Sequence, residues 1–300
     1  MNEKVCVIVL NWNGKEVIQP CLDSLLAVRS PELHVIVVDN ASTDGSQKIV
    51  EERYPSVELI ENESNLLFAE GNNVGIRKAL EEDADFILIL NNDTVVEPDS
   101  VEAMMGAMKS NERVGIVGPK ILYYDEPNRI WFGGGGFYPV VWVPRHINIR
   151  KIDGTFVDER SDTGYVTGCA MLVRRGVFET AGFLDPGYRI YSEDVDFCLR
   201  AKQCGWRVIY EPSARIYHKV SSSSGGGLTP FKIQNRVAST IVLHRRFKPL
   251  WWRVLLFPIH AVLFAVMLLF LLAKGHSELA SAAVRGLKSA TARIMGGGPQ

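Results

Sequence analysis

Cysteine is scarce in this chain, and the few copies are widely spaced. The 300 residues contain Cys6, Cys21, Cys169, Cys198 and Cys204. No two of them form the CxxC pair that is typical of zinc ribbons and thioredoxin-like redox sites. Scattered thiols in odd number are typical of reduced, buried side chains, so we expect no disulfide framework. The start of the chain leads straight into an apolar run, which is not the pattern of a secretory signal peptide.

An excess of charge of either sign is also missing, although the charges are unevenly distributed. The formal net charge is -1 at pH 7. This value argues against a general nucleic-acid binder, because such proteins need many cations to neutralise phosphates. Residues 228–300 nevertheless contain ten Lys and Arg against a single acid, Glu278, and residues 1–227 are correspondingly acidic. A basic tail that also holds the longest apolar run predicts contact with anionic lipid.

Short apolar runs alternate with segments of helical spacing over the first 120 residues. The runs predict strands at 5–10, 35–38, 57–60 and 86–90, and the segments between them predict helices at 15–28, 46–53, 69–80 and 98–108. Strands without polar alternation are buried on both faces, and strands that alternate with helices form right-handed parallel βαβ units. The sequence therefore predicts an α/β sandwich with a mostly parallel sheet. Ligands of such folds bind beyond the carboxyl ends of the strands.

The pattern weakens between residues 133 and 162 and then returns. The four-glycine run at 133–136 indicates an irregular, partly mobile excursion, since no lysine or helix start follows it at the spacing of a phosphate-binding loop. Further on we expect strands at 165–173, 206–210 and 214–217 and a helix at 192–203. The Ser/Gly-rich segment 221–227 predicts a flexible loop that closes over a bound diphosphate.

The tail from Trp251 onward differs in kind from the rest. Residues 254–273 contain no Asp, Glu, Lys or Arg, and such a length can cross a hydrocarbon core of roughly 30 Å. Pro258 interrupts this run and both flanks are basic, so a span and a re-entrant hairpin broken at Pro258 both stay open. A buried helix of a soluble protein is a third alternative. Residues 278–294 predict an interfacial amphipathic helix with a cationic face. We therefore expect a catalytic domain at 1–228 and a membrane-associated helical region at 229–300.

Polar residues follow three of the expected strands. Asn11 comes after the first, Asp39 after the second and Asp93 after the fourth. An Asp at a strand exit is often only a turn or helix cap, but Asp93 can also hold Mg²⁺ or Mn²⁺, which prefer oxygen ligands. Asp39 can accept the imide N–H of a uracil or thymine ring, and Asn11 is well placed for the nucleoside.

Three further positions carry candidate chemistry. The segment Ser192-Glu193-Asp194 begins an expected helix, which fits N-terminal capping and dipole matching as well as a general base. Asp196 and Arg200 are four residues apart on that helix and predict an ordinary surface ion pair. His218 precedes the Ser/Gly-rich loop and is either a structural histidine or a second metal ligand through its neutral imidazole.

Six short segments between residues 4 and 220 carry a recognisable pattern. They are VCVIVLNWNG at 5–14, VVDNASTDGS at 37–46, NND at 91–93, TGCAMLVRR at 167–175, GFLD at 182–185 and EDVD at 193–196. In this order and at this spacing they resemble the family 2 glycosyltransferases. The resemblance implies the GT-A nucleotide-diphospho-sugar transferase fold, a Rossmann-like mixed and mostly parallel sheet. The Asp39-Asn40 pair and the Asn91–Asp93 triplet are most similar to the rhamnosyltransferase-like branch.

The resemblance implies a role for each matched residue. Asp39 would bind the base, and Asp194 matches the catalytic base of the family. Asn91 replaces the first acid of the family's DxD motif, which leaves Asp93 as the matched metal ligand, and His218 matches a histidine that joins the metal site in many relatives. The implied set is catalytic Asp194, substrate-binding Asn11, Asp39, Asn40, Asn91, Asn92 and Glu193, and metal-binding Asp93 and His218.

The resemblance also implies a reaction. Members of the family invert the anomeric centre in one displacement, in which the base deprotonates an acceptor hydroxyl while Mg²⁺ or Mn²⁺ stabilises the leaving diphosphate. The expected donor is dTDP-rhamnose, with UDP-hexose and UDP-galactofuranose as alternatives. The basic, apolar tail predicts a lipid-linked or polysaccharide acceptor at the cytoplasmic face of the cell membrane, and no nucleic-acid partner.

Two other classes of function stay open on the sequence. A nucleotidyltransferase would need a basic, glycine-rich loop after the first strand, and Asn13-Gly14-Lys15 is a poor version of one. A non-catalytic, membrane-tethered protein that binds nucleotide sugars is supported by Asn91, which stands where the family carries an acid.

Overall fold

The computed structural model describes residues 3–220 and 228–296. Its strands are β1 (Val5–Asn11), β2 (Leu33–Asp39), β3 (Glu58–Glu61), β4 (Phe86–Asn91), β5 (Thr94–Val96), β6 (Val114–Tyr123), β7 (Ile130–Phe132), β8 (Gly135–Phe137), β9 (Pro144–His146), β10 (Ser161–Asp162), β11 (Ala170–Arg174) and β12 (Arg207–His218). Its helices are α1 (Ile18–Leu26), α2 (Ser46–Arg53), α3 (Leu67–Glu81), α4 (Ser100–Lys109), α5 (Arg175–Ala181), α6 (Glu193–Gln203), α7 (Pro230–Phe247), α8 (Leu250–Ala273), α9 (Ser277–Gly296) and the 3₁₀ turn η1 (Pro186–Tyr188). The predicted closing loop at 221–227 lies outside the described residues.

The main sheet is mixed but mostly parallel. Its strand order is β10-β12-β6-β11-β4-β1-β2-β3, with β5 paired to β12 and β7 to β6. Strands β1 to β4 run parallel, as do β6 and β12, whereas β11 lies antiparallel between β4 and β6. The β1 side chains from Val5 to Val9 are fully buried, because helices cover both faces of the sheet. The expected α/β architecture is thus confirmed.

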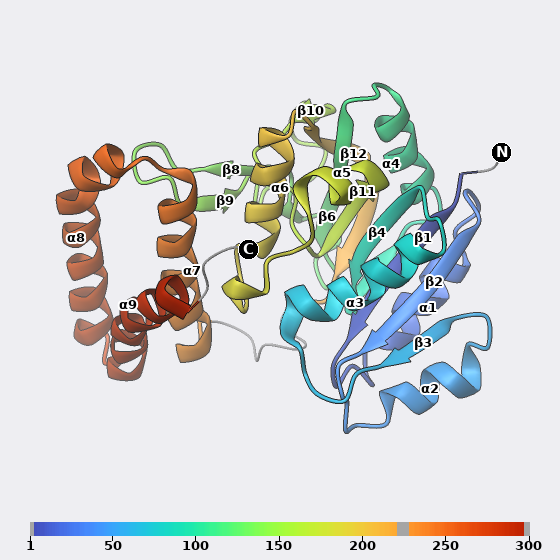
Figure 1. Ribbon diagram of the computed structural model, residues 1–300, viewed down its shortest axis with the longest axis horizontal. Coiled ribbons are helices and arrows are strands. Elements are labelled where there is room, and N and C mark those ends of the chain that lie inside the picture. The colour runs from blue at the N-terminus through green and yellow to red at the C-terminus, as the bar shows by residue number, and fades with distance from the viewer. Residues whose placement is uncertain (1–2, 221–227, 297–300) are drawn as a thin grey trace.

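Helices pack on this sheet, and the polar ends of several strands lie at one of its edges. α3 packs on β1 and β2, and α4 packs on β6 and β12. Figure 1 shows α3 and α6 across the near face, with the C-terminal helices beyond α6. The carboxyl ends of β4 and β12 and the start of α6 therefore meet at the edge where the sequence predicts ligands.

The sequence analysis missed β6, although it lies in the middle of the sheet. Pro119 and two glycines interrupt its apolar run, and both residue types weaken a strand signal. The partner strand bulges beside the proline, because Glu211 pairs with Pro119 while Arg215 pairs with Lys120. The two strands expected at 206–210 and 214–217 are consequently one strand, β12.

The excursion after the glycine run is more ordered than predicted. β8 and β9 form a two-stranded ribbon, and the turn between them reaches the C-terminal helices. The Trp142 carbonyl lies 3.2 Å from His244 Nε2 of α7, and the Val141 carbonyl lies 3.2 Å from His260 Nε2 of α8. The expectation of an irregular segment is wrong here, because contacts distant in sequence hold the ribbon.

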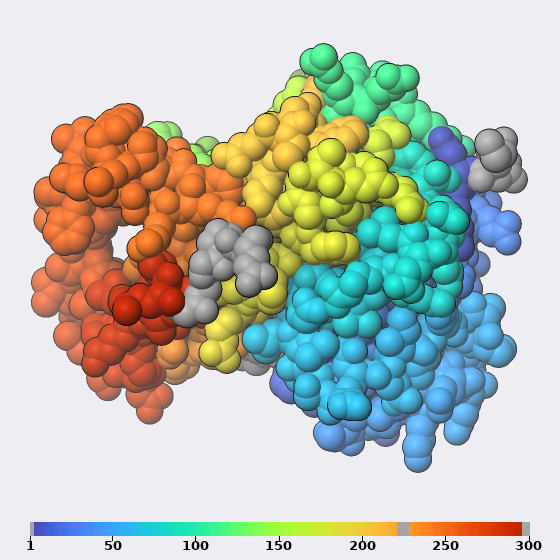
Figure 2. All heavy atoms as spheres, in the orientation of Figure 1, coloured from blue at the N-terminus to red at the C-terminus, as the bar shows by residue number. Residues whose placement is uncertain are grey.

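The C-terminal helices form a lobe beside the sheet, coloured orange to red in Figures 1 and 2. α7 was not predicted, and the division of the chain at residue 228 stays a prediction. α8 continues through Pro258, so the break that a re-entrant hairpin would need is not present. This helix is long and apolar enough to cross a membrane, and only 6% of its most apolar window is buried.

α9 differs from the predicted interfacial helix. Its small side chains Ala282 and Ala283 are fully buried in a cluster that includes Ile233 of α7. Arg285 and Lys288 are exposed as expected. Arg293 instead donates to the Tyr188 carbonyl, 2.6 Å away, so one cation of the predicted cationic face attaches α9 to η1.

Two helical glycines provide a test of the packing of α3 on the sheet. A Cβ at Gly75 would lie 2.6 Å from Ile8 Cγ2 and 2.9 Å from Val38 Cγ2, whereas nothing lies within 4 Å of a Cβ at Gly106 in α4. Gly75→Ala should lower the free energy of unfolding by about 1–3 kcal/mol through overpacking. Gly106→Ala should raise it by up to about 1 kcal/mol through helix propensity. Urea denaturation measures both, and equal effects would contradict the close approach.

Candidate functional site

A cavity of about 610 Å³ opens at the carboxyl ends of β4 and β12. Five of the predicted site residues line it, namely Asn91, Asp93, Glu193, Asp194 and His218. They come from the end of β4, the turn after it, the start of α6 and the end of β12. Folding thus brings together residues that are up to 127 positions apart in the sequence.

The two predicted metal ligands are neighbours. Asp93 lies in the turn between β4 and β5, and His218 ends β12 beside β5, so pairing of β5 with β12 fixes their separation. His218 Nε2 lies 3.2 Å from Asp93 Oδ1, and both side chains are buried. Burial alone would lower the pKa of His218, but Cys169 and the Asp93 carboxylate raise it to about 10. The Asp93 carboxylate thus favours the protonated form of His218.

This pair fits Mg²⁺ or Mn²⁺. A buried carboxylate oxygen from the turn between β4 and β5 and an imidazole nitrogen from the end of β12 point at one another and face an open cavity. Manganese accepts both donor types and magnesium prefers the oxygen. An ion between these groups would take the place of the imidazole proton.

A second group of possible ligands lies at the opposite edge of the sheet. Ligand atoms of His34, Glu58 and Glu82 lie within 4.8 Å of one another near the starts of β2 and β3. The Lys78 ammonium is 2.8 Å from Glu82 and 3.2 Å from Glu58, and the Lys4 ammonium is 3.1 Å from Glu82. Two cations already neutralise these carboxylates, so we interpret the group as an ion-pair cluster.

Burial raises the pKa values of both carboxylates that begin α6, Glu193 and Asp194. Asp194 accepts hydrogen bonds from the backbone N–H of Gly168 at 2.9 Å and of Val195 at 2.7 Å. Burial raises the pKa of Asp194, but these donors stabilise its charged form. Burial and the charge of Asp194 raise the pKa of Glu193 to about 8. Near neutral pH Glu193 therefore keeps its proton, whereas at Asp194 the two N–H donors oppose the effect of burial.

The turn before α6 is strained. Tyr191 and Ser192 have φ values of 67° and 70°, which are uncommon for residues other than glycine. Ser192 occupies the N-cap position, but its side chain makes no capping hydrogen bond, so the capping interpretation is wrong for this residue. Strained backbone persists where surrounding contacts hold it, and such positions cluster at functional sites.

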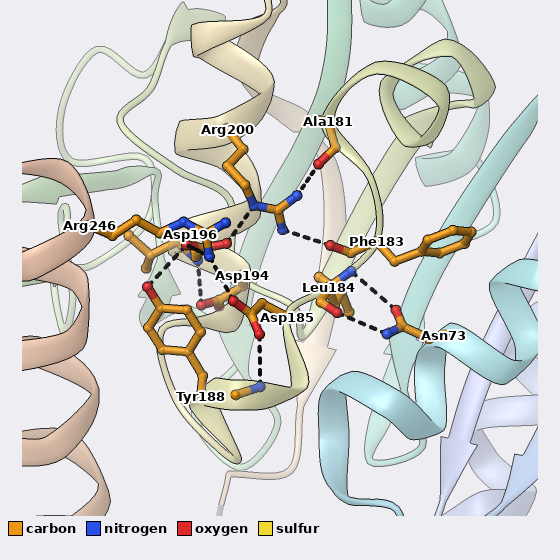
Figure 3. A network of polar contacts seen from close by, with 12 residues as sticks. Asn73, Ala181, Phe183, Leu184, Asp185, Tyr188, Asp194, Asp196, Arg200 and Arg246 are labelled. Atoms are coloured by element: carbon orange, nitrogen blue, oxygen red, sulfur yellow. Dashed lines mark hydrogen bonds and ion pairs between the residues drawn. The ribbon is translucent and has the colours of Figure 1, made fainter. Parts of the chain in front are cut away.

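A buried ionic network supplies those contacts (Figure 3). Asp196 is fully buried and lies 2.6 Å from Arg200 Nε of α6 and 3.0 Å from Arg246 Nη1 of α7. Tyr188 donates its hydroxyl to Asp196 at 3.0 Å, and Arg246 also contacts Asp185 at 2.7 Å. The prediction of a surface pair between Asp196 and Arg200 is therefore wrong, because α5, η1 and α7 cover it.

The residues predicted for the nucleotide lie together but do not line the cavity. Asn92 donates to Asn11 at 2.8 Å, and Asn11 donates to Asp39 Oδ2 at 2.7 Å. The Ser42 N–H donates to Asp39 Oδ1 at 2.7 Å, and Asn40 donates to the Leu67 carbonyl at 3.1 Å. These residues form a buried polar floor at the ends of β1 and β2, and their contact with a nucleotide stays a prediction.

The sequence analysis missed several residues that line the cavity. Among them are the aromatic or basic residues Trp131, Arg145, His146, Tyr165, Lys232 and Arg236. Arg145 and His146 lie on the unpredicted ribbon. Lys232 and Arg236 belong to the tail that was assigned only to lipid contact, although their spacing of four residues places them on one helix face.

Comparisons with known proteins agree with this arrangement. The family model described as Glycosyl transferase family 2 matches residues 6–182. Over 270 residues the chain is 27% identical to N-acetylglucosaminyl-diphospho-decaprenol L-rhamnosyltransferase of Mycobacterium tuberculosis, covering 84% of this chain and 88% of the relative. Over 228 residues it is 25% identical to dTDP-rhamnosyl transferase RfbF of Shigella flexneri, covering 75% and 72%.

A solved structure shows the same fold. The chain matches GalNAc-T7, crystallised with UDP, GalNAc and Mn²⁺, with a TM-score of 0.61 at 15% identity. The match covers 79% of this chain and 47% of the other, so this chain spans about half of that protein. The likeness confirms the predicted GT-A fold.

Removal of the buried Asp196 carboxylate should lower the free energy of unfolding far more than removal of an exposed carboxylate. Asp196→Ala leaves the partly buried guanidinium of Arg200 without its carboxylate partner and should lower the free energy of unfolding by about 3–5 kcal/mol. The control is Asp162→Ala, which removes an exposed pair with Arg207 and should cost less than about 1 kcal/mol. Chemical denaturation compares the two variants. A similar small loss in both would contradict a buried network.

Proposed function

Because the chain belongs to glycosyl transferase family 2 and is a glycosyltransferase of nucleotide sugars, we propose a metal-dependent, inverting transfer of a sugar to an acceptor hydroxyl. The observation that carries this proposal is the shared cavity of Asp93, Asp194 and His218. Asp194 is the group suited to hold a proton in transit, since its neighbour Glu193 is protonated near neutral pH.

Asp194 acts as the general base. Its carboxylate removes the proton of the acceptor hydroxyl as that oxygen attacks the anomeric carbon, and the bond from this carbon to the diphosphate breaks on the opposite side. One bond forms as one breaks, so the configuration inverts. The Gly168 and Val195 N–H groups keep the carboxylate oriented. A divalent ion held by Asp93 and His218 would supply positive charge for the leaving diphosphate.

The proposed donor is dTDP-rhamnose. Two relatives over most of this chain carry rhamnosyltransferase names, one of them with dTDP in its name. The buried floor formed by Asn11, Asp39, Asn40 and Asn92 lies at the neighbouring strand ends, where the nucleoside would bind. A UDP-hexose and UDP-galactofuranose are the alternative donors.

The proposed acceptor is lipid-linked or a growing polysaccharide, at the cytoplasmic face of the membrane. One relative is named for a diphospho-decaprenol acceptor. Exposed apolar side chains cover α8, including Leu255, Phe257 and Phe270. An exposed apolar surface of this size is typical of membrane or partner contact. The lobe that carries it borders the cavity through α7.

Replacement of Asp194 should slow the chemical step and leave donor binding nearly unchanged. Asp194→Asn keeps the shape and an acceptor for the Gly168 N–H but cannot take a proton. Turnover should fall by about 10²- to 10⁴-fold, while donor binding in the presence of Mn²⁺ stays nearly unchanged in calorimetry. Asp162→Asn, at an exposed ion pair, is the matched control and should keep full activity. Full activity of Asp194→Asn would remove this residue as the base.

The metal assignment has a binding test that needs no turnover. Asp93→Asn should weaken Mn²⁺ binding, measured by electron paramagnetic resonance with a nucleoside diphosphate present, by at least about tenfold. Glu82→Gln, in the ion-pair cluster at the other edge, should leave it unchanged. The opposite ranking of the two variants would place the ion at His34, Glu58 and Glu82.

A further inference from the structure

Three basic side chains line the cavity that contains Asp93 and Asp194. Arg145 comes from β9, and Lys232 and Arg236 come from α7. Arg145 thus belongs to the ribbon, and Lys232 and Arg236 belong to the C-terminal lobe. Asp93 and Asp194 belong to the main sheet and the helices before the lobe, here called the body. The cavity is therefore composite, and the chain segments that carry these three basic side chains are distinct from those that carry the acids.

The two arginines have aromatic rather than acidic neighbours. The Arg236 guanidinium lies 5.2 Å from the centre of the Tyr191 ring, and that of Arg145 lies 5.2 Å from the centre of the Tyr138 ring. Within residues 3–220 and 228–296 neither arginine forms an ion pair with an acid. Burial, together with the charge of Arg236, lowers the pKa of Lys232. Positive charge is thus concentrated here.

The acids that share the cavity are engaged with other groups. Asp93 pairs with His218 at 3.2 Å. Asp194 accepts from the Gly168 N–H at 2.9 Å, and Glu193 has a pKa of about 8 and is largely neutral. None of the three supplies a counter-charge for Arg145 or Arg236. Arg145 and Arg236 are exposed, so both are accessible to an anion that enters the cavity.

The position of these cations in the chain indicates which anion they bind. The donor diphosphate is assigned to Asp93 and His218 at the strand ends. Arg236 instead lies on α7, and only two residues separate the end of α7 from α8. α8 is the exposed apolar helix, so the cations and the lipid-facing surface belong to one lobe. An acceptor with an apolar chain and a phosphate group would match both features.

We propose that Arg236 and Arg145, with Lys232, form a subsite for the phosphate or diphosphate of a lipid-linked acceptor. This inference rests on the proposed function and decides between the two acceptor classes, because a neutral polysaccharide has no group for these cations. Guanidinium groups bind phosphate through paired N–H donors, which adds orientation to charge. Such a subsite would hold the acceptor hydroxyl near Asp194.

The subsite can be tested by binding alone, with the donor site filled. The full chain in non-ionic detergent is saturated with Mn²⁺, dTDP and UDP, and calorimetry then measures binding of farnesyl diphosphate, farnesol and inorganic pyrophosphate. Farnesyl diphosphate should bind with the nucleotides in place, and pyrophosphate should compete with it. Farnesol should bind at least about tenfold more weakly, as expected for loss of a charge-assisted contact.

Variants connect this binding to the named residues. Arg236→Met should weaken farnesyl diphosphate binding by about tenfold or more, and Arg145→Met, on a different element, should do the same. Arg245→Met, an exposed position of α7, is the matched control and should change nothing. Nucleotide binding should be unchanged in all three, which also verifies that each variant is folded.

Each other outcome overturns the subsite. Displacement of farnesyl diphosphate by the nucleotides would assign the cations to the donor. Equal binding of farnesol and farnesyl diphosphate would leave only an apolar site, and equal effects of Arg236→Met and Arg245→Met would remove Arg236. Failure of the proposed function is distinguishable, because absence of sugar transfer with intact farnesyl diphosphate binding would contradict the enzyme chemistry and not the subsite.

Discussion

Asp196 is fully buried, and guanidinium groups from two helices, Arg200 of α6 and Arg246 of α7, balance its charge. Separation of these helices would leave a charge uncompensated in a medium of low dielectric constant, which is costly. The start of α6, the strained turn at Tyr191 and the C-terminal lobe are therefore held as one unit. Asp194, two residues before Asp196, takes its position from this constraint.

The same constraint would allow one cavity to serve the two proposed substrates. The body supplies Asp93, Asp194 and His218 at strand and helix ends, where a nucleotide sugar and an ion would bind. The lobe supplies Arg236 and the apolar surface of α8. Arg246 contacts Asp185 and Arg293 contacts the Tyr188 carbonyl, so both attach the lobe to the segment before α6. The positions of the basic groups relative to the acidic groups are therefore fixed. A reaction between a soluble donor and a membrane-bound acceptor needs such an arrangement.

Local pattern predicted most of the fold, and distant contacts account for what it missed. β1 and β4 could be predicted because they are unbroken apolar runs. β6 was not predicted, because Pro119 interrupts its apolar run. The carboxylates at 93 and 194 could be found from their places at element ends. The cations could not, since the contribution of Arg236 to the cavity depends on how α7 packs against a ribbon and a turn that are distant in sequence. The burial of Asp196 likewise comes from packing that no local pattern encodes.

The account depends most on ion-assisted cleavage of a nucleotide sugar in this cavity. The direct measurement is release of nucleoside diphosphate from dTDP-rhamnose, UDP-galactofuranose and UDP-hexoses by the purified chain with membrane lipid extract and Mn²⁺. The account predicts release from one of these donors, fastest from dTDP-rhamnose, loss of release with a chelator, and a product of inverted anomeric configuration by nuclear magnetic resonance. Release that is unaffected by the chelator, or no release from any donor, would contradict it.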